Sequence, residues 1–378
     1  MTTLPLFAPA PAERVAVVCF GFEADRVRRQ PWHVADGLAS GAVALGHHVR
    51  LFTDAADPPE GEDYEVARVP ALFVRGRASR PLREALAAFG PDRVLVICGT
   101  LLLARLRALD LGAPVTLVMT SPRVKLREFA RLMPQTWWRE LDVLRGPLRD
   151  ALVPGPLLRW GYARSGATSV VYLSQAARSR YTALGLPEGL MLPPQVRNHP
   201  WPPAPRGARP RIGYLGPALD LRGAWLALET FEAAARLGLD AELLLCLRPD
   251  GGRRSLLRLL RRVRRSPVRA RVRCTTEMLS SDELRDRLAT CHAFLLPFKV
   301  PVSEVPLVVI ESGLSGRPLV VLDAPGVSEY AHYFGGLVGV SPEALPALLL
   351  RACSRTPIRP ADPRPWTRWD EALEPVLA

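Results

Sequence analysis

Short apolar runs alternate with helical segments along most of the chain. Each run is rich in β-branched residues and is bounded by turn residues, which predicts a buried strand. The predicted strands of the first half are Arg14–Phe20, His48–Asp54, Asp92–Cys98, Pro114–Thr120 and Ser169–Ser174. The predicted helices between them include Trp32–Leu45, Pro81–Phe89 and Gln175–Leu184. Because apolar strands that alternate with helices are typical of a parallel sheet covered on both faces, the first half predicts an α/β domain.

The alternation stops at a proline-rich segment, Gln195–Pro210, and then begins again. This segment cannot form regular structure, because proline lacks a backbone N–H and has a fixed φ angle. The predicted strands of the second half are Arg211–Gly216, Ala241–Leu247, Val268–Cys274, Ala293–Pro297 and Pro318–Asp323. We therefore predict two parallel-sheet domains joined by a hinge. Ligands bind outside the carboxyl ends of such strands, so the two domains are expected to face each other across a binding cleft.

The composition agrees with this organisation and adds a strong positive charge. A length of 378 residues fits two domains. Basic residues exceed acidic ones by 50 − 37 = 13, and Lys125 and Lys299 are the only lysines. Arginine forks bind phosphate and carboxylate, so nucleotides, phospholipid headgroups or nucleic acid are candidate partners, unless arginine is simply the general surface cation. We expect no nucleic-acid partner, because neither a recognition module nor a set of stacking aromatics is evident.

Several other classes of protein are excluded. The six cysteines lack CxxC spacing and the six histidines lack ligand spacing, so we expect no structural metal site. No cofactor is expected either. No apolar run is long enough to span a membrane. Met1–Pro11 has neither a basic region nor a long apolar core, so it does not resemble a signal peptide. A soluble, cytoplasmic protein is therefore expected.

One segment with candidate chemistry is Gly216–Gly223, where a strand ends and a helix follows. Gly216 lets the backbone approach a ligand, and the helix N-terminus offers N–H groups for phosphate. Arg222 in the same turn has a fork suited to a diphosphate. The alternative is an ordinary turn between strand and helix with a solvated arginine.

A second such segment, Ser303–Glu311, is predicted to open another helix. Pro306 suits the first turn, and Ser303 or Glu304 suits the cap. Glu311 lies about one and a half turns into this helix. Its carboxylate can accept two hydrogen bonds from a ribose diol. A tight turn at Pro325–Glu329 then starts a further helix.

From Ala293 to Val340 the chain resembles the C-terminal signature of retaining glycosyltransferases of family four, which have the GT-B fold. The residues that match in order and spacing are Pro297, Pro306–Ser312, Gly316–Pro318 and Gly326–Glu329. Gly216–Gly223 resembles the phosphate turn of that family, with Arg222 at the position of its lysine. Further similar segments are Pro31–Val34, Leu45–Val49, Ser174–Gly185 and Pro365–Trp369, the last of which resembles a terminal helix that returns to the first domain.

The resemblance implies a GT-B enzyme of two Rossmann-like domains that face each other across a cleft. It divides the chain into an acceptor-side domain (residues 1–199), a hinge (200–209) and a nucleotide-sugar-binding domain (210–364). Residues 365–378 are expected to pack back on the first domain. The implied activity is retaining, hexosyltransferase-like transfer from a nucleotide-sugar donor to a glycan or lipid-linked acceptor, as in polysaccharide biosynthesis, without a metal.

The resemblance also implies roles for particular residues. Arg222 would stabilise the leaving diphosphate, and Glu304, or Ser303 as the second choice, would contact the donor sugar as a catalytic group. The residues implied to bind the nucleotide sugar are Gly216, Arg222, Pro306, Leu307, Glu311 and Glu329. His33 matches a histidine in the first helix of the family, on the acceptor or sugar side, although a capping or packing role fits equally well.

Departures from the family pattern leave an alternative open. Ser303 stands where the first signature glutamate is expected, with Glu304 one residue later. Pro217 replaces an arginine of the phosphate turn, and Arg28–Pro31 replaces a Gly-Gly loop. The alternative to an enzyme is therefore a non-catalytic binding or scaffold protein of the same fold with an eroded donor site.

An anionic membrane surface is a further candidate partner. Arg123–Arg164 interleaves arginines with Trp137, Trp138 and Trp160, and aromatic residues beside cations suit a headgroup layer, with ordinary packing as the alternative. Arg253–Arg273 is also basic and amphipathic, but packing of its apolar face on its own sheet is the favoured interpretation. The expected location is cytoplasmic, with peripheral binding at the inner face of the membrane.

Overall fold

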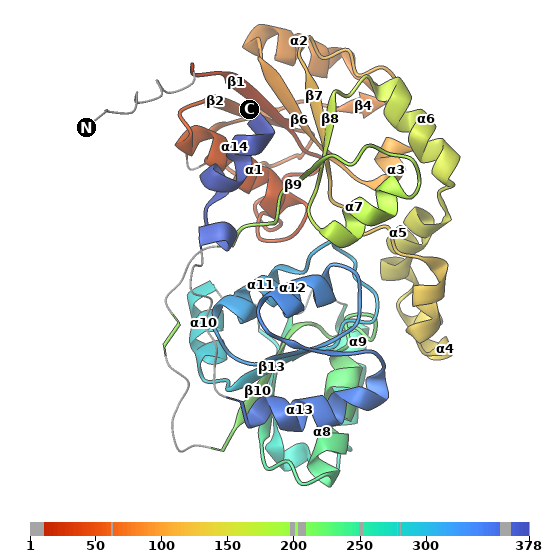
Figure 1. Ribbon diagram of the computed structural model, residues 1–378, viewed down its shortest axis with the longest axis vertical. Coiled ribbons are helices and arrows are strands. Elements are labelled where there is room, and N and C mark those ends of the chain that lie inside the picture. Colours follow the sequence, from red (N-terminus) through yellow and green to blue (C-terminus); the bar gives the residue numbers. More distant parts are fainter. Residues whose placement is uncertain are drawn as a thin grey trace, which may run out of the picture.

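The computed structural model describes residues 11–61, 63–196, 201–202, 209–248, 252–277, 279, 281–355 and 364–377. Residues 200 and 203–208 of the predicted hinge therefore lie outside the described residues. The chain forms two parallel sheets, each covered by helices, which lie one above the other in Figure 1. The predicted α/β class with two parallel-sheet domains is confirmed.

The first sheet has the strand order β3–β2–β1–β6–β7–β8–β9, and all neighbouring strands are parallel. Its strands are β1 (Arg14–Val18), β2 (His48–Thr53), β3 (Glu65–Arg68), β6 (Arg93–Cys98), β7 (Val115–Met119), β8 (Ser169–Tyr172) and β9 (Leu190–Met191). The helices around it are α1 (Trp32–Ala44), α2 (Arg80–Phe89), α3 (Thr100–Leu103), α6 (Gly155–Ser165) and α7 (Gln175–Thr182), and β4 (Phe73–Val74) and β5 (Arg77–Ala78) form a hairpin. Helices cover both faces, so the central strand β1 is apolar and buried from Val15 to Val18.

The second sheet has the strand order β12–β11–β10–β13–β14–β15, again with parallel neighbours. Its strands are β10 (Arg211–Pro217), β11 (Glu242–Arg248), β12 (Val272–Thr275), β13 (Ala293–Leu296), β14 (Leu319–Leu322) and β15 (Leu337–Gly339). Its helices are α8 (Ala224–Arg236), α9 (Arg253–Arg264), α10 (Ser281–Ala289), α11 (Leu307–Leu314), α12 (Val327–Tyr333) and α13 (Leu345–Cys353), with short 3₁₀ turns η3 (Arg269–Arg271) and η4 (Pro342–Ala344). Leu259 and Val263 of α9 are buried in the core of this domain. The basic helix α9 therefore packs on its own sheet.

The end of the chain returns to the first domain. After η5 (Arg364–Trp366), helix α14 (Trp369–Leu377) lies beside α1, as Figure 1 shows. The two helices approach closely at Gly37, where a Cβ atom would lie 2.0 Å from the Trp369 side chain. A side chain at this position would displace the indole, so glycine permits the contact.

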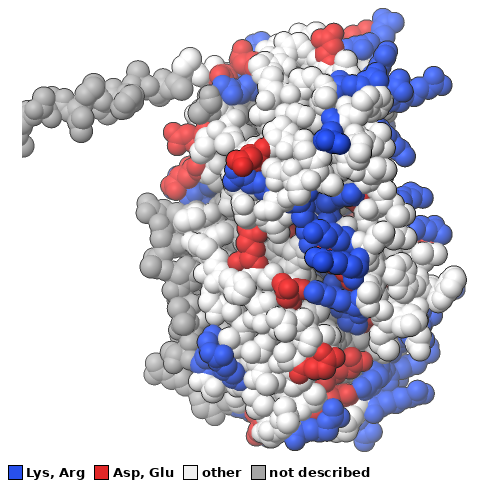
Figure 2. Space-filling model, turned by 45° about the vertical axis from the view of Figure 1, so that its right-hand side comes forward, with Lys and Arg blue, Asp and Glu red and all other residues white. Residues whose placement is uncertain are grey.

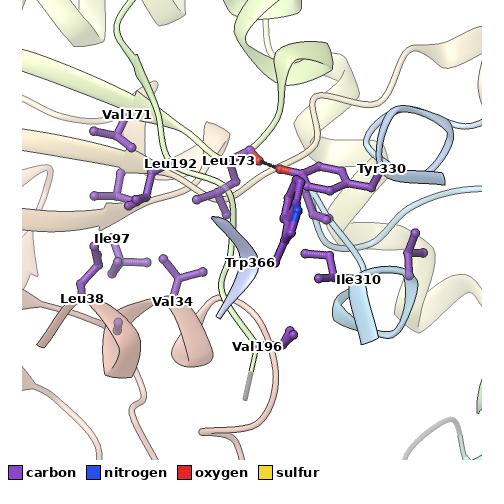
Figure 3. Packing of buried hydrophobic residues seen from close by; sticks show 14 of the residues in the cluster. Val34, Leu38, Ile97, Val171, Leu173, Leu192, Val196, Ile310, Tyr330 and Trp366 are labelled. Atoms are coloured by element: carbon purple, nitrogen blue, oxygen red, sulfur yellow. Dashed lines mark hydrogen bonds between the residues drawn. The ribbon is translucent and has the colours of Figure 1, made fainter. Parts of the chain in front are cut away.

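Buried residues of both domains form a continuous core around Trp366 (Figure 3). Val34 and Leu173 contribute from the first domain, and Ile310 and Tyr330 from the second. The Tyr330 hydroxyl donates a hydrogen bond of 2.5 Å to the Leu173 carbonyl oxygen. Apolar packing and a buried hydrogen bond thus join the two domains directly.

A second junction is made by an excursion of the first domain that follows β7. The excursion consists of η1 (Leu126–Arg131), α4 (Pro134–Arg139) and α5 (Leu141–Leu152). Its buried residues Phe129 and Leu144 pack with Leu219, Leu221 and Val300 of the second domain. The excursion therefore holds the turn that follows β10.

Candidate active site

The carboxyl edge of the second sheet brings together the strongest candidate residues. The strand order reverses between the neighbours β10 and β13, and ligands bind outside the carboxyl ends of strands at such a point. Arg222 lies in the turn after β10, with its guanidinium carbon 4.8 Å from the centroid of the Phe298 ring. Gly223 of the same turn has a φ of 78°, and a Cβ there would lie 2.1 Å from the Pro297 carbonyl oxygen. Only glycine fits this position, and it brings the turn against the end of β13.

Glu311 lies on α11 at the same edge, half-buried. Burial raises the pKa of the Glu311 carboxyl, and the charge of Arg248 at the end of β11 opposes that rise. The edge thus holds a carboxylate that feels the charge of Arg248, the last residue of β11, and the turn after the neighbouring strand β10 carries Arg222. The expectation that Ser303 or Glu304 caps α11 is wrong, because its N-cap is Pro306, which has no N–H, and Leu307 is its first residue. Gly216 is the second-last residue of β10.

Two of the predicted site residues face the first domain. The Ser174 hydroxyl donates a hydrogen bond of 3.0 Å to Oε1 of Glu304, which is only 1% exposed. Burial raises the pKa of Glu304 well above its usual range, against the effect of the hydrogen bond from Ser174. Glu329 accepts backbone hydrogen bonds from Gln175 at 2.9 Å and Ala176 at 3.0 Å. These bonds cap the N-terminus of α7, where the helix dipole favours a negative charge.

Ser303 faces a cavity of about 250 Å³ between the two domains. Val302 and Ser303 line it from the second domain. The first domain contributes the remaining walls, which are Cys19, Phe20, Gln30, Pro31, Ile97, Gly99, Leu102, Thr120 and Ser121. The predicted cleft between the domains therefore contains a definite cavity.

His33 occupies a packing position. Its Nε2 lies 2.6 Å from the Gln195 carbonyl oxygen, and its ring centroid lies 6.0 Å from that of Trp369. His33 is not among the residues that line the cavity. It therefore joins α1 to the returning C-terminal segment.

Sequence reasoning missed Glu140, which lies between α4 and α5. Its carboxylate accepts the backbone N–H groups of Asp220 at 2.6 Å and Leu221 at 3.1 Å. Burial raises the pKa of Glu140, and these two hydrogen bonds act against the rise. Asp220 in turn accepts hydrogen bonds from the Thr136 hydroxyl at 2.6 Å and the Lys299 ammonium at 2.5 Å. The sequence held one signal of this cluster. Lys299, which binds Asp220, is one of only two lysines in an arginine-rich chain.

The described part of the chain holds no group of three or more His, Cys, Asp or Glu side chains that could bind a metal ion. Among the same residues, no helix is long and apolar enough to cross a membrane.

Two parallel-sheet domains that face each other across a cleft are the architecture of the GT-B fold. Residues 31–194 match the family described as a glycosyl transferase 4-like domain. No curated protein matches the sequence. The resemblance to glycosyltransferases of family four is nevertheless confirmed, by this domain in the first half and by the GT-B fold of the whole chain.

Solved structures are similar over nearly the whole length. Anabaena HepE, in complex with UDP and glucose, has a TM-score of 0.62 and 13% identity, over 96% of this chain and 94% of that chain. Sucrose-phosphate synthase from Thermosynechococcus elongatus has a TM-score of 0.59 and 16% identity, over 96% and 94%. WaaG, a glycosyltransferase involved in lipopolysaccharide biosynthesis, has a TM-score of 0.56 and 18% identity, over 94% and 95%. At these identities the likeness concerns the fold.

Proposed function

We propose that the protein is a retaining glycosyltransferase that moves a sugar from a nucleotide-sugar donor to a glycan or lipid-linked acceptor. The observation that carries the proposal is the position of Arg222 and Glu311 at the carboxyl edge of the second sheet, beside the strand-order reversal. Anabaena HepE, which has a similar fold, forms complexes with UDP and with UDP-glucose. This supports a nucleotide sugar as the donor.

The main chemical task is to stabilise the departing nucleoside diphosphate while the anomeric carbon becomes cationic. Arg222 and the N-terminus of α8 supply positive potential beside the developing charge. Glu311 accepts hydrogen bonds from the ribose hydroxyls. Ser303, which lines the cavity, contacts the donor sugar. Glu304 is the neighbouring candidate catalytic group, and its carboxylate is held by the hydrogen bond from Ser174. Enclosure between the domains excludes water, which would otherwise hydrolyse the donor.

We also propose peripheral binding to an anionic membrane through the excursion and α6. Trp138 is 85% exposed, Met133 49% and Trp160 44%. Figure 2 shows Lys and Arg side chains gathered on the side of the molecule that carries these helices. Trp137 instead packs against Phe129, with ring centroids 5.7 Å apart. Trp138 and Trp160 are therefore the aromatic residues available to a headgroup layer.

A transfer assay tests the proposed activity. Wild-type protein is incubated with UDP-, GDP- and ADP-linked hexoses, with and without glycan and lipid-linked acceptors, and products are followed by mass spectrometry and NMR. The proposal predicts transfer with the anomeric configuration of the donor retained. Binding of a sugar nucleotide without turnover under any acceptor would support the scaffold alternative.

A further inference from the structure

The cavity lies at the binding edge of the first sheet. Cys19 follows β1, Gly99 follows β6, and Thr120 follows β7. The strand order of this sheet reverses between β1 and β6, so the cavity lies at the place where such sheets bind ligands. Val302 and Ser303 cover it from the second domain. At about 250 Å³ the cavity is smaller than the sites that hold drug-sized ligands, and a single sugar ring is a suitable occupant.

Gln30 is the unusual residue of this cavity. Both its Oε1 and Nε2 atoms are shielded from solvent, and neither has a hydrogen-bond partner among the residues that the structure describes. Buried polar groups in native proteins are nearly always hydrogen-bonded, and an unpaired one destabilises the fold. A carboxamide can donate two hydrogen bonds and accept two. It therefore matches neighbouring hydroxyl groups, each of which can donate and accept.

The walls of the cavity are otherwise uncharged. None of the described side chains that line it is Asp, Glu, Lys, Arg or His. Burial raises the pKa of the Cys19 thiol, so the thiol stays neutral. The half-exposed ring of Phe20 forms one wall, backed by Phe73 at 5.4 Å between centroids. A sugar carries both apolar C–H faces and hydroxyl groups, so it suits a cavity that offers an aromatic ring and an amide. A phosphate or carboxylate would be buried in this cavity without a counter-charge.

We propose that this cavity binds one uncharged sugar ring, that the Gln30 amide hydrogen-bonds two of its hydroxyls, and that the site rejects phosphorylated and uronic sugars. The proposal rests on the proposed glycosyltransferase function and specifies its sugar. Gln30 is thus a specificity-determining residue in a segment that replaces the Gly-Gly loop expected there. Because Ser303 of the same cavity is proposed to contact the donor sugar, the donor is the expected source of the ring, and the competition experiment tests it against the acceptor.

Saturation-transfer NMR tests the proposal. The probes are methyl α-D-glucopyranoside, methyl α-D-mannopyranoside and methyl α-D-galactopyranoside, with glucose 6-phosphate and glucuronate as anionic counterparts. We expect saturation transfer to at least one neutral glycoside, and at least fivefold less to either anion. Gln30→Leu should reduce the neutral signal at least fivefold without lowering the melting temperature, because it removes an unpaired amide. Gln135→Leu, at an exposed glutamine of α4, is the matched control.

Competition identifies the source of the ring. UDP-glucose, GDP-mannose and ADP-glucose are added, each compared with its nucleoside diphosphate. Displacement by a sugar nucleotide but not by its diphosphate assigns the ring to the donor, and retained glycoside binding assigns it to the acceptor. No neutral binding, equal binding of the anions or an unchanged Gln30→Leu signal would overturn the proposal. If wild-type protein binds none of these sugar nucleotides or diphosphates, the proposed function itself is contradicted. A failure of the cavity proposal and a failure of the proposed function can therefore be distinguished.

Discussion

The Glu140 carboxylate of the first domain accepts a hydrogen bond from the backbone N–H of Asp220 in the second domain, with an N–O distance of 2.6 Å. Asp220 lies in the turn that carries Arg222. A side chain of the first domain therefore holds the backbone of the proposed phosphate turn in the second domain. The contact links domain docking to the position of that turn.

Removal of the Glu140 carboxylate should lower both the stability of the fold and the turnover rate. Glu140→Ala leaves two buried N–H groups without their acceptor, which we expect to lower the free energy of unfolding by about 1–3 kcal/mol. Turnover should fall further than stability alone explains, because Arg222 loses its fixed position. Urea unfolding and kcat are the measurements, and Asp142→Ala, at an exposed acid of α5, is the control. Unchanged kcat in folded Glu140→Ala protein would mean that the contact only aids folding.

Substitutions of Arg222 separate charge from geometry. Arg222→Ala should lower kcat more than Arg222→Lys, because lysine keeps the charge but lacks the planar fork. We expect a loss of about tenfold or more for alanine, since a hydrogen bond to a charged group contributes about 1.5–3 kcal/mol. Steady-state kinetics with the preferred donor measure the difference. Equal, mild effects would indicate that backbone N–H groups hold the diphosphate.

Burial of Glu304 predicts a pH dependence of stability. Burial raises the pKa of Glu304 above its value in the unfolded chain, which is about 4.3 for glutamate. As the pH rises above that value, the folded protein binds more protons than the unfolded one, so stability falls. Glu304→Gln removes this loss. The variant should therefore gain stability relative to wild type, and the gain should be larger at pH 8 than at pH 5. Thermal unfolding at both pH values measures this, and a difference that does not change with pH would contradict it.

Membrane binding should depend on Trp138. Wild-type protein is expected to co-sediment with anionic vesicles at low salt, and less at high salt because screening weakens the attraction. Trp138→Ala should bind roughly tenfold more weakly, since burial of a large apolar side chain contributes about 1.5–3 kcal/mol. Leu237→Ala, at an exposed residue of the second domain, is the control. Equal sedimentation of wild type and Trp138→Ala would place the contact elsewhere.

The sequence predicted the two sheets because the pattern that identifies a parallel strand is local. Val15–Val18 and Phe294–Leu296 are apolar in every position, as burial on both faces requires. The start of α12 could also be predicted, since the expected turn Pro325–Glu329 contains Val327, where the helix begins. Backbone preferences and burial act over a few residues, so one chain segment suffices to infer them.

The partners of the acidic side chains could not be predicted in this way. Glu329 lies in the expected turn, but its carboxylate caps α7, more than 150 residues earlier. Glu140 lies in a segment whose arginines and tryptophans predicted either a membrane surface or ordinary packing, and neither interpretation gave this carboxylate a partner. Both contacts depend on how the two domains dock, and no local sequence pattern encodes that arrangement. The unpaired amide of Gln30 likewise becomes apparent only in three dimensions.

Isothermal titration calorimetry of nucleoside diphosphates tests the central claim most directly. UDP, GDP and ADP are titrated into wild-type protein, Glu311→Gln and the control Glu374→Gln, an exposed position on α14. The account predicts that at least one diphosphate binds wild type and Glu374→Gln equally. Glu311→Gln should bind it about tenfold or more weakly with an unchanged melting temperature, because a charge-assisted pair with the ribose is weakened by about 1.5–3 kcal/mol. No binding by wild type, or equal binding by Glu311→Gln, would contradict the assignment of this edge as the nucleotide-sugar site.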